Sequence, residues 1–503
     1  MWIALFQLIL TEWKTGILAS MELVAITFNI VGIYSMKAIL KRQFLQLHRQ
    51  VGSLFGILLF IILLTGTWSL AHENLNIWVQ FKPLNKELLP LDQLLAKGEY
   101  FLGENGFNSV KLPSIDHPII TFCQGMGDCS LQLNAQTGEE ITVREVISPI
   151  VNLHKNLFMG FSGRLFISLF GFVFALLLIT GIVIHHRKVY QLFRLRFNQG
   201  RRLFFFDLHN VIGLWSYPWL VMFALTGALS GLGAFGTLML AKYVEPEAPA
   251  QVMMKLMGQS TPVSSEFIAS SPSSLLIQLS QEKADFIPET INWKNRGNAE
   301  QQITVSGINL YLPSTANFEQ LFFSGLDNHW IAEKSAVSQQ FWTRAFIAIQ
   351  PLHYGQYLWT GSANFSLSVL HCLMGMMACV LTFSGLIIWV LKKPINISSR
   401  LVLGGCSGLI FASTCLIPIA IFSALSPILP FFSVWLITLL FYLFYPQVIK
   451  LTFLILTISS VVLFISVFSH LFITHAALWW VSCALLISAV FYFLMGLFLL
   501  KRQ

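Results

Sequence analysis

Charged residues are scarce in this sequence. Only 11% of its 503 residues are charged, whereas 55% are hydrophobic and the mean hydropathy is +0.69. Because a soluble domain carries about 25% charged residues, much of this surface cannot face water, and the chain is predicted to be an integral membrane protein. The formal charge of +8 does not indicate a nucleic-acid partner, since the basic residues cluster beside hydrophobic segments and act there as topology signals.

Other absences exclude several classes of function. None of the seven cysteines forms a CxxC pair, which argues against a zinc or iron–sulfur site. None of the predicted membrane spans contains Asp or Glu, the usual coupling groups of ion-driven transporters. The GxGxxG match at Gly231–Gly236 ends a hydrophobic run and follows no strand, so a dinucleotide site is not expected.

Eight hydrophobic runs are long enough to cross a bilayer, for which about 20 apolar residues are needed. They lie at 50–71, 162–185, 210–236, 364–391, 401–423, 427–446, 451–473 and 476–500. A weaker run at 16–36 contains Glu22 and Asn29 and lacks the frame of a signal peptide. Residues 1–35 are therefore interpreted as an upstream extension or an extra hydrophobic segment, with Met36 as an alternative start.

Basic residues set the predicted orientation. They gather before the first span, between the second and third, after the fourth and at the C-terminus: Lys37, Lys41, Arg42 and Arg49; Arg187, Lys188, Arg194, Arg196, Arg201 and Arg202; Lys392, Lys393 and Arg400; Lys501 and Arg502. With eight spans all four clusters lie on one side, so both termini are predicted to be cytoplasmic. The two long connections then lie outside.

These two connections are too polar for the membrane and are predicted to be small α+β domains. Helical spacing occurs at 91–102 and 274–283, and strand-like runs occur at 119–122, 131–133, 303–305 and 308–312. Cys123 and Cys129 flank a glycine-rich turn in the first connection. In an oxidising compartment they are expected to form a disulfide, with two free thiols as the alternative.

An internal repeat organises the first 390 or so residues. Each copy has a Leu-His pair opening a span that ends in Thr-Gly, an outer segment, a second Leu-His pair, and a span containing Gly and then Thr-Gly or Ser-Gly. The matched positions are His48 and His209, Thr65-Gly66 and Thr226-Gly227, His154 and His353, Gly171 and Gly375, and Thr180-Gly181 and Ser384-Gly385.

Four motifs within the repeat carry a family resemblance. They are Leu-His-Arg-x-x-Gly at 47–52, Leu-Asn-Ala-Gln-Thr-Gly-Glu-Glu at 133–140, Leu-His-Lys-Asn-Leu-Phe-Met-Gly at 153–160 and Asp-Leu-His-Asn-Val-Ile-Gly-Leu-Trp at 207–215. In this order they resemble the PepSY-associated transmembrane family, over residues 36–393. The chain departs from the pattern in its four C-terminal spans, and in Asn210 and Lys155 where the family often has Arg.

The resemblance implies a function. The family includes inner-membrane ferrisiderophore reductases, in which histidines at the ends of a four-helix bundle hold two b-type haems. It therefore implies a multi-pass protein of the bacterial inner membrane with two periplasmic PepSY-like domains. Such a protein would pass electrons outward to reduce a ferric siderophore or another Fe(III) complex for iron uptake.

The predicted fold is a polytopic α-helical membrane protein. A duplicated unit of span, PepSY-like α+β domain and span forms a four-helix bundle, and four further spans follow. The predicted segments are the first transmembrane helix, 36–71; the first outer domain, 72–160; helices two and three with their basic loop, 161–237; the second outer domain, 238–362; the fourth helix, 363–393; and the C-terminal membrane region, 394–503.

The repeated histidines suit haem. Ionisable side chains at membrane depth point to function, and neutral imidazole is a good axial ligand for haem iron. His48 and His209 both open spans that start on the inner side, so they are expected at equal depth, where they could clamp one iron. His154 and His353 could clamp a second iron on the outer side. Their alternative role is as ordinary juxtamembrane residues.

Other histidines compete less well. His371, inside the fourth span, is an alternative outer ligand in place of His154 or His353, or a propionate partner. His72, at the outer end of the first span, is another competitor. His470 and His475, near the outer ends of the last two spans, are expected to be interfacial.

Two functions remain in competition. In the first, electrons enter from an unidentified donor, either a quinol or a cytoplasmic reductase, because no segment resembles a flavin domain. In the second, the spans only anchor PepSY-type domains that bind or regulate a partner without redox chemistry. The first predicts a haem protein that is sensitive to histidine substitution, and the second predicts no cofactor.

Overall fold

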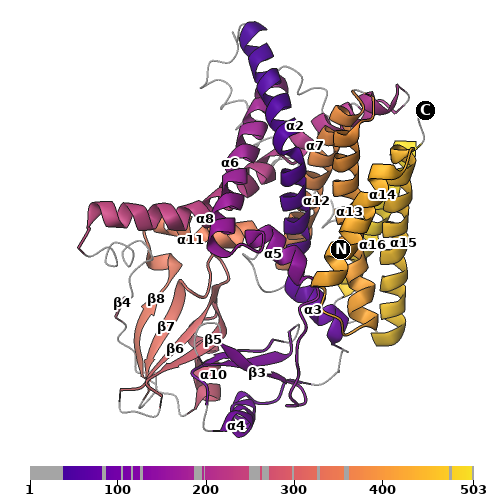
Figure 1. The fold of residues 1–503 in the computed structure, drawn as a ribbon. Coiled ribbons are helices and arrows are strands. Elements are labelled where there is room, and N and C mark those ends of the chain that lie inside the picture. Colours follow the sequence, from indigo (N-terminus) through magenta and orange to yellow (C-terminus); the bar gives the residue numbers. More distant parts are fainter. Residues whose placement is uncertain are drawn as a thin grey trace, which may run out of the picture.

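The computed structural model describes most of the chain. The described residues are 38–81, 87–103, 106–114, 117–124, 128–185, 195–197, 199–247, 261–262, 271–296, 300–325, 329–355, 362–392, 394–474 and 479–500. The predicted upstream segment 1–35 lies outside them, as do the topology signals Lys37, Arg187, Lys188, Arg194, Lys393, Lys501 and Arg502. Figure 1 shows the long helices on one side of the molecule and the strands on the other.

The predicted polytopic helical architecture is confirmed. Among the described residues, six helices are long and apolar enough to cross a membrane. They are α2 (Ala38–Ser69), α6 (Gly160–His185), α12 (Ser362–Val390), α13 (Ile397–Phe422), α15 (Val448–Thr474) and α16 (Trp479–Leu500). The apolar helix α14 (Ile428–Phe444) is shorter, with 17 residues.

The third predicted span differs from a straight helix. It is divided into α7 (Arg201–Trp215) and α8 (Tyr217–Val244), which meet at an angle of 73°. Pro218 stands in the first turn of α8, where its ring removes a backbone donor and would clash with the preceding turn of a continuous helix. The apolar composition of 210–236 therefore predicted the helix content, and the proline explains the break.

The repeat unit packs its helices against one another. Contacts join α2 to α6 and α12, α7 to α12, and α6 to α8. A hydrophobic cluster between these helices includes Leu59, Phe170, Phe174, Leu220 and Leu381. This packing brings the matched segments of the two repeat copies into one bundle.

The C-terminal helices form a continuous core with that bundle. α13 packs against α2, α14 and α15, and α15 packs against α16. The shared hydrophobic cluster includes Phe60 of α2, Phe383 of α12, Leu409 of α13, Leu463 of α15 and Leu485 of α16. The four C-terminal helices therefore support the repeat unit along its side.

The two outer segments share one antiparallel sheet of eight strands, in the order β3-β2-β1-β5-β6-β7-β8-β4. Its strands are β1 (Ser109–Lys111), β2 (Ile119–Cys123), β3 (Cys129–Asn134), β4 (Thr261–Pro262), β5 (Phe286–Lys294), β6 (Gln302–Asn309), β7 (Glu319–Ser324) and β8 (Trp330–Lys334). The sequence predicts two separate modules, but β1 of the first pairs with β5 of the second, with Val110 opposite Ile291. Pairing satisfies two strand edges that would otherwise expose unpaired backbone groups.

Several local predictions for these segments hold. The helix predicted at 91–102 is α4 (Leu91–Leu102), and that predicted at 274–283 is α10 (Pro272–Glu282). Cys123 and Cys129 form the predicted disulfide. The two runs predicted at 303–305 and 308–312 are one strand, β6, which passes through Gly307 without interruption and ends at Asn309.

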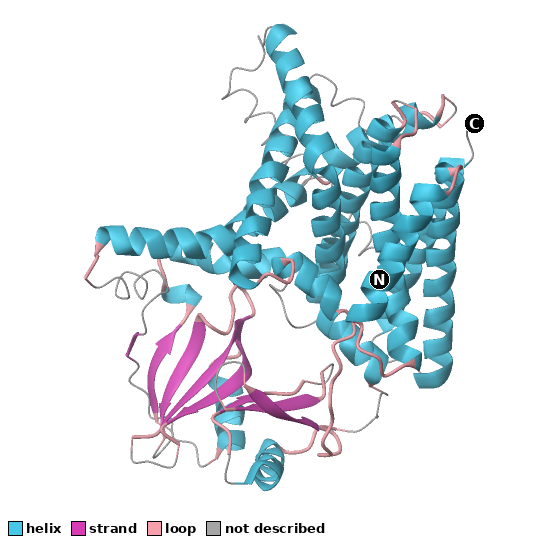
Figure 2. Cartoon of the chain, in the orientation of Figure 1, coloured by secondary structure: helices cyan, strands magenta, loops and turns pink. Residues whose placement is uncertain are grey.

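Short helices join the sheet to the membrane region and were not predicted. They are α3 (His72–Gln80), α5 (Ser148–Asn156) and α11 (Phe341–Tyr354). Figure 2 shows these helices between the sheet and the long helices. Two of them carry the outer histidines of the repeat, so these residues are held by regular structure and not by loops.

Glu289 is a partly buried acid in the sheet. It lies where the register of β5 against β6 shifts between Pro288 and Thr290. Burial raises its pKa to about 7, with Glu73 adding repulsion and Lys111 opposing the shift. Because the folded-state pKa lies above the ordinary value, folding takes up a proton between pH 4.5 and about 7.

We therefore expect Glu289 to contribute stability as the pH falls from about 7 to about 4.5, with no further gain below, whereas the buried neutral histidines act in the opposite direction. Glu289→Gln is expected to remove this dependence and to raise stability at pH 8 by an amount on the order of 1–3 kcal/mol. Thermal unfolding of the full chain in detergent at pH 5 and pH 8 measures this. Glu282→Gln, at the exposed end of α10, is the control, and an unchanged pH dependence in Glu289→Gln would contradict the prediction.

Candidate functional site: two pairs of facing histidines

The first pair joins the N-terminal part of α2 to α7. The rings of His48 and His209 have their centroids 6.2 Å apart and their planes at 80°. We call these two residues the far-side pair, because they lie at the end of the bundle away from the sheet. The sequence-based expectation that they occupy equal depth agrees with this geometry.

The second pair joins the two short helices that connect to the sheet. His154 of α5 and His353 of α11 have ring centroids 6.0 Å apart and planes at 12°. We call them the sheet-side pair. Burial lowers the pKa of His154, and it lowers the pKa of His353 to about 3, with the neighbouring His154 and His371 adding to that effect. Both rings are therefore neutral imidazoles at physiological pH.

Backbone carbonyls fix the tautomer of one histidine in each pair. The Nδ1 of His154 lies 2.9 Å from the carbonyl oxygen of Ile62, and the Nδ1 of His209 lies 2.9 Å from that of Leu381. A carbonyl only accepts, so Nδ1–H must donate in both cases. In the neutral form of each ring the lone pair then lies on Nε2, the nitrogen farther from the backbone.

Threonine hydroxyls fix the same tautomer in the other two histidines. The Nδ1 of His48 lies 2.9 Å from Thr180 Oγ1, and the Nδ1 of His353 lies 2.9 Å from Thr226 Oγ1. Both hydroxyls donate their proton to a carbonyl of their own helix, 2.8 Å and 2.6 Å away. Each hydroxyl oxygen can therefore accept from Nδ1–H, which again leaves the lone pair on Nε2.

The four glycines of the repeated Thr-Gly and Ser-Gly pairs each face one histidine ring. A Cβ added at Gly66 would lie 2.6 Å from His154 Cε1, and one at Gly385 would lie 3.1 Å from His209 Cε1. The corresponding values for the other two are 3.3 Å between Gly227 and His353 and 3.5 Å between Gly181 and His48. The four glycines matched by the repeat therefore form cradles for the four rings.

The two pairs lie near opposite ends of α2. Fourteen residues separate His48 from Ile62, whose carbonyl holds His154, and that spacing corresponds to about 21 Å along a helix. Each pair thus has one member held by a carbonyl and one held by a threonine. The duplication seen in the sequence is therefore a duplication of a histidine with its glycine, whereas the group that holds Nδ1 differs between the two copies.

This geometry fits the axial ligation of haem. Two imidazoles bound through Nε2 on opposite sides of an iron, at about 2 Å each, have ring centres about 6 Å apart. The observed distances are 6.2 and 6.0 Å. Ligating histidines also typically donate their other nitrogen to a carbonyl or similar group, as all four do here. Over the described residues, no group of three or more His, Cys, Asp or Glu side chains is placed to hold a metal ion.

The competing histidines have other surroundings. His371 of α12 is buried and places its Nε2 3.2 Å from the backbone oxygen of His353. His72 forms an ion pair with Glu145. His470 is fully buried within the protein and stacks on Trp78 with centroids 3.7 Å apart, and its expected depth at the membrane interface stays a prediction. His475 lies outside the described residues.

Sequence reasoning found the four histidines and their glycines but not all their partners. Thr180 and Thr226 were assigned no role beyond their place in the repeated Thr-Gly pairs, and their hydroxyls hold His48 and His353. Their spacing within the repeat was a signal that could have identified them. The carbonyls of Ile62 and Leu381 leave no trace in the sequence, because any residue supplies a carbonyl.

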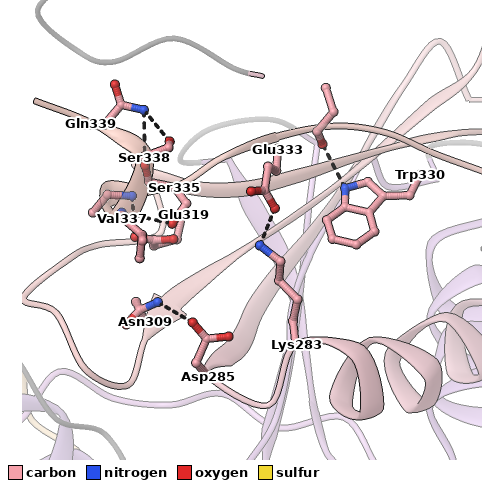
Figure 3. A network of polar contacts seen from close by, with 12 residues as sticks. Lys283, Asp285, Asn309, Glu319, Trp330, Glu333, Ser335, Val337, Ser338 and Gln339 are labelled. Atoms are coloured by element: carbon pink, nitrogen blue, oxygen red, sulfur yellow. Dashed lines mark hydrogen bonds and ion pairs between the residues drawn. The ribbon is translucent and has the colours of Figure 1, made fainter. Parts of the chain in front are cut away.

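A separate polar pocket lies at the ends of β5 to β8 that lead toward α11 (Figure 3). Lys283 pairs with Glu333, and Asp285 accepts a hydrogen bond of 2.9 Å from Asn309. Burial raises the pKa of Glu319, whose carboxylate accepts from the backbone N–H of Ala336. The pocket volume of about 160 Å³ is below the roughly 300–1,000 Å³ typical of small-molecule sites.

Comparison with known proteins places this arrangement in a family. A family model described as the PepSY-associated TM region matches residues 45–392. An uncharacterised protein of Pseudomonas aeruginosa is 40% identical over 278 residues, which are 53% of this chain and 71% of that protein. The matched region of the family model contains both histidine pairs and all four glycine cradles.

Proposed function

Because the chain belongs to the PepSY-associated transmembrane family, we propose that it is a haem-containing electron-transfer protein of the bacterial inner membrane. Electrons would cross the membrane to reduce a periplasmic ferric complex, such as a ferric siderophore, for iron uptake. The observation that carries this proposal is the pair of facing imidazoles at each end of α2, 6.2 and 6.0 Å apart.

Two b-type haems, one held by His48 and His209 and one by His154 and His353, would supply reversible one-electron transfer at iron. The chain itself does three things. It presents Nε2 lone pairs by donating every Nδ1–H to a carbonyl or threonine oxygen. It orients the rings with glycines, and it leaves the sheet-side pair only partly exposed.

Charge supports the direction of transfer. The far-side pair adjoins Lys41, Arg42 and Arg49 on α2 and Arg201 and Arg202 on α7, and basic residues favour the cytoplasmic side. The far-side pair would then face the cytoplasm and a donor, either a quinol or a reductase. The sheet would lie in the periplasm, where the disulfide of its first three strands suits an oxidising environment.

The substrate would be reduced beside the sheet. An Fe(III) complex accepts one electron and becomes Fe(II), which hard oxygen ligands hold less strongly, so the iron is released. The sheet-side pair stands on α5 and α11, which connect the sheet to the bundle. The polar pocket is too small for a whole ferric siderophore, so such a complex would rest on a broader surface of this region.

The first test is the cofactor content of the purified protein. Protein from haem-replete cells is expected to show a Soret band and about two haems per chain. The two haems are expected to give different low-spin electron paramagnetic resonance signals. The imidazole planes meet at 80° in the far-side pair and at 12° in the sheet-side pair, and the angle between the two imidazole planes sets the splitting of the iron orbitals. A folded, haem-free protein would contradict the proposal and favour the membrane-anchored binding or regulatory protein.

The second part of this test is turnover. Reduced protein, freed of excess reductant, is mixed anaerobically with a ferric hydroxamate, and Fe(II) is trapped with a chromogenic chelator. Reoxidation of the haem spectrum with matching Fe(II) formation is expected. If the haem protein stays reduced in the presence of several ferric complexes, the proposed ferric substrate is wrong. The proposal that the protein transfers electrons would still stand.

A further inference from the structure

His371 is a histidine of the site region that has no counterpart in the repeat. It lies four residues before Gly375, and the position four residues before the matched Gly171 is Ile167. The residue is 1% exposed and lies near the start of a membrane helix, α12, where an imidazole is costly to bury without a polar role. The second copy therefore buries a polar imidazole at a position where the first copy has the apolar Ile167.

The polar contact of this residue is with the backbone of a predicted ligand. Its Nε2 lies 3.2 Å from the carbonyl oxygen of His353. That carbonyl belongs to the last turn of α11, where carbonyls lack partners within the helix. Because a carbonyl only accepts, His371 must donate Nε2–H and so closes the end of the helix that carries His353.

Packing fixes His371 against that helix end. Gly355 has a φ of +68°, and a Cβ added there would lie 2.8 Å from His371 Cδ2, so the ring sits directly on the turn that ends α11. Phe223 contacts the ring edge to face, with centroids 4.8 Å apart, and also lies edge-on to His353 at 6.5 Å.

These contacts converge on one residue. Phe223 is three positions before Thr226 and so shares its face of α8, and Thr226 holds the Nδ1 of His353. His353 is thus fixed by a hydroxyl at its ring, by an aromatic edge beside it, and by His371 at its backbone. Its partner His154 has its ring held by the carbonyl of Ile62.

We propose that His371 is a positioning residue of the sheet-side site, which acts by holding the end of α11 and with it the ring of His353. The role rests on the proposed function, and it differs from that of an iron ligand. Its Nε2–H is committed to a carbonyl, and the facing ring pair of this site is His154 with His353. Partners of this kind typically change metal affinity by about 10- to 100-fold.

The experiment compares four variants of the full chain with the wild type. His371→Phe keeps the ring shape and removes the donor, whereas His371→Gln keeps an N–H donor. His353→Ala identifies the spectroscopic signal of the sheet-side haem. His470→Phe, which removes another fully buried histidine in contact with Trp78 and outside both pairs, is the matched control for burial. Haem content, haem dissociation to apomyoglobin and electron paramagnetic resonance are measured on each.

The expected result is selective. His371→Phe is expected to broaden or shift the signal that His353→Ala removes and to speed loss of that haem about 10- to 100-fold, while the other signal is unchanged. His371→Gln is expected to restore most of the wild-type behaviour, and His470→Phe to leave both signals in place.

Other results would overturn the inference. If His371→Phe leaves the sheet-side signal and its haem loss unchanged, His371 does not position that site. If His371→Gln abolishes the signal while His353→Ala retains it, His371 is itself the ligand. A wild-type protein without haem would overturn the proposed function and this inference together, so the two failures are distinguishable.

Discussion

Under the proposed function, replacing either member of the far-side pair by alanine is expected to remove one haem of two and to stop transmembrane electron transfer. His48 and His209 face each other at 6.2 Å, and alanine leaves one axial position without a protein donor. The haem count is expected to fall from about two to about one per chain. The signal that remains should be that of the near-parallel sheet-side pair.

The effect on function should exceed the effect on cofactor content. The two pairs are about 21 Å apart along α2, and electron tunnelling falls exponentially with distance. With one carrier missing, a donor on the far side cannot reach the sheet side at a useful rate. Reduction of a ferric complex in proteoliposomes with donor on the inside only is therefore expected to fall to background, whereas direct chemical reduction of the remaining haem persists.

His72→Ala is the matched control for this prediction. His72 stands just beyond the other end of α2 and pairs with Glu145, so its loss is expected to leave both haems and the rate intact. Two haems in both His48→Ala and His209→Ala would contradict the assignment of the far-side pair. Loss of both haems in His72→Ala would make that residue part of the machinery.

The repeat made much of this site predictable. A histidine at a fixed distance from a Thr-Gly pair, found twice, identified both pairs and their glycines before any geometry was known. Equal spacing in two copies of a helical unit produces equal depth, because the rise of a helix per residue is constant. The elements named by strong periodicity, such as the helix at Leu91–Leu102, were also found at the predicted bounds.

What escaped prediction depends on contacts distant in sequence. The pairing of β1 with β5 joins strands from two outer segments, and neither strand alone carries a sign of its partner. α5 and α11 are too short and too mixed in composition to have been separated from the polar segments before them. The stacking of Trp78 in α3 on His470 of α15 is another contact between segments that lie far apart in the sequence.

The break between α7 and α8 was not predicted, because hydropathy alone makes 210–236 one span. Pro218, in the first turn of α8, is the residue in the sequence that indicates the break. The break redirects α8 so that Thr226 and Gly227 meet His353 of α11. A kink at proline therefore serves the site, because a straight continuation of α7 would point these two residues elsewhere.

A methyl group at Gly66 is expected to displace the sheet-side haem and spare the other. A Cβ there would lie 2.6 Å from Cε1 and 2.9 Å from Nδ1 of His154, closer than real contacts allow. The ring must move, and moving it breaks the 2.9 Å hydrogen bond to Ile62 that sets its tautomer. Gly66→Ala is expected to weaken sheet-side haem binding about 10- to 100-fold, although alanine favours the helix itself by up to about 1 kcal/mol.

The other three glycines extend this test, because the distance from the added Cβ to the histidine ring differs among them. The added Cβ would lie 3.1 Å from His209 at Gly385, 3.3 Å from His353 at Gly227 and 3.5 Å from His48 at Gly181, so the haem loss caused by alanine should fall in that order. Gly236→Ala, with nothing within 4 Å of its added Cβ, controls for alanine in α8. Haem retention after dilution, resolved by the two low-spin signals, measures the series. If Gly66→Ala and Gly181→Ala retain haem equally, the glycines serve helix packing alone. A difference in haem retention is expected only where a shift of the histidine ring weakens its bond to the haem iron.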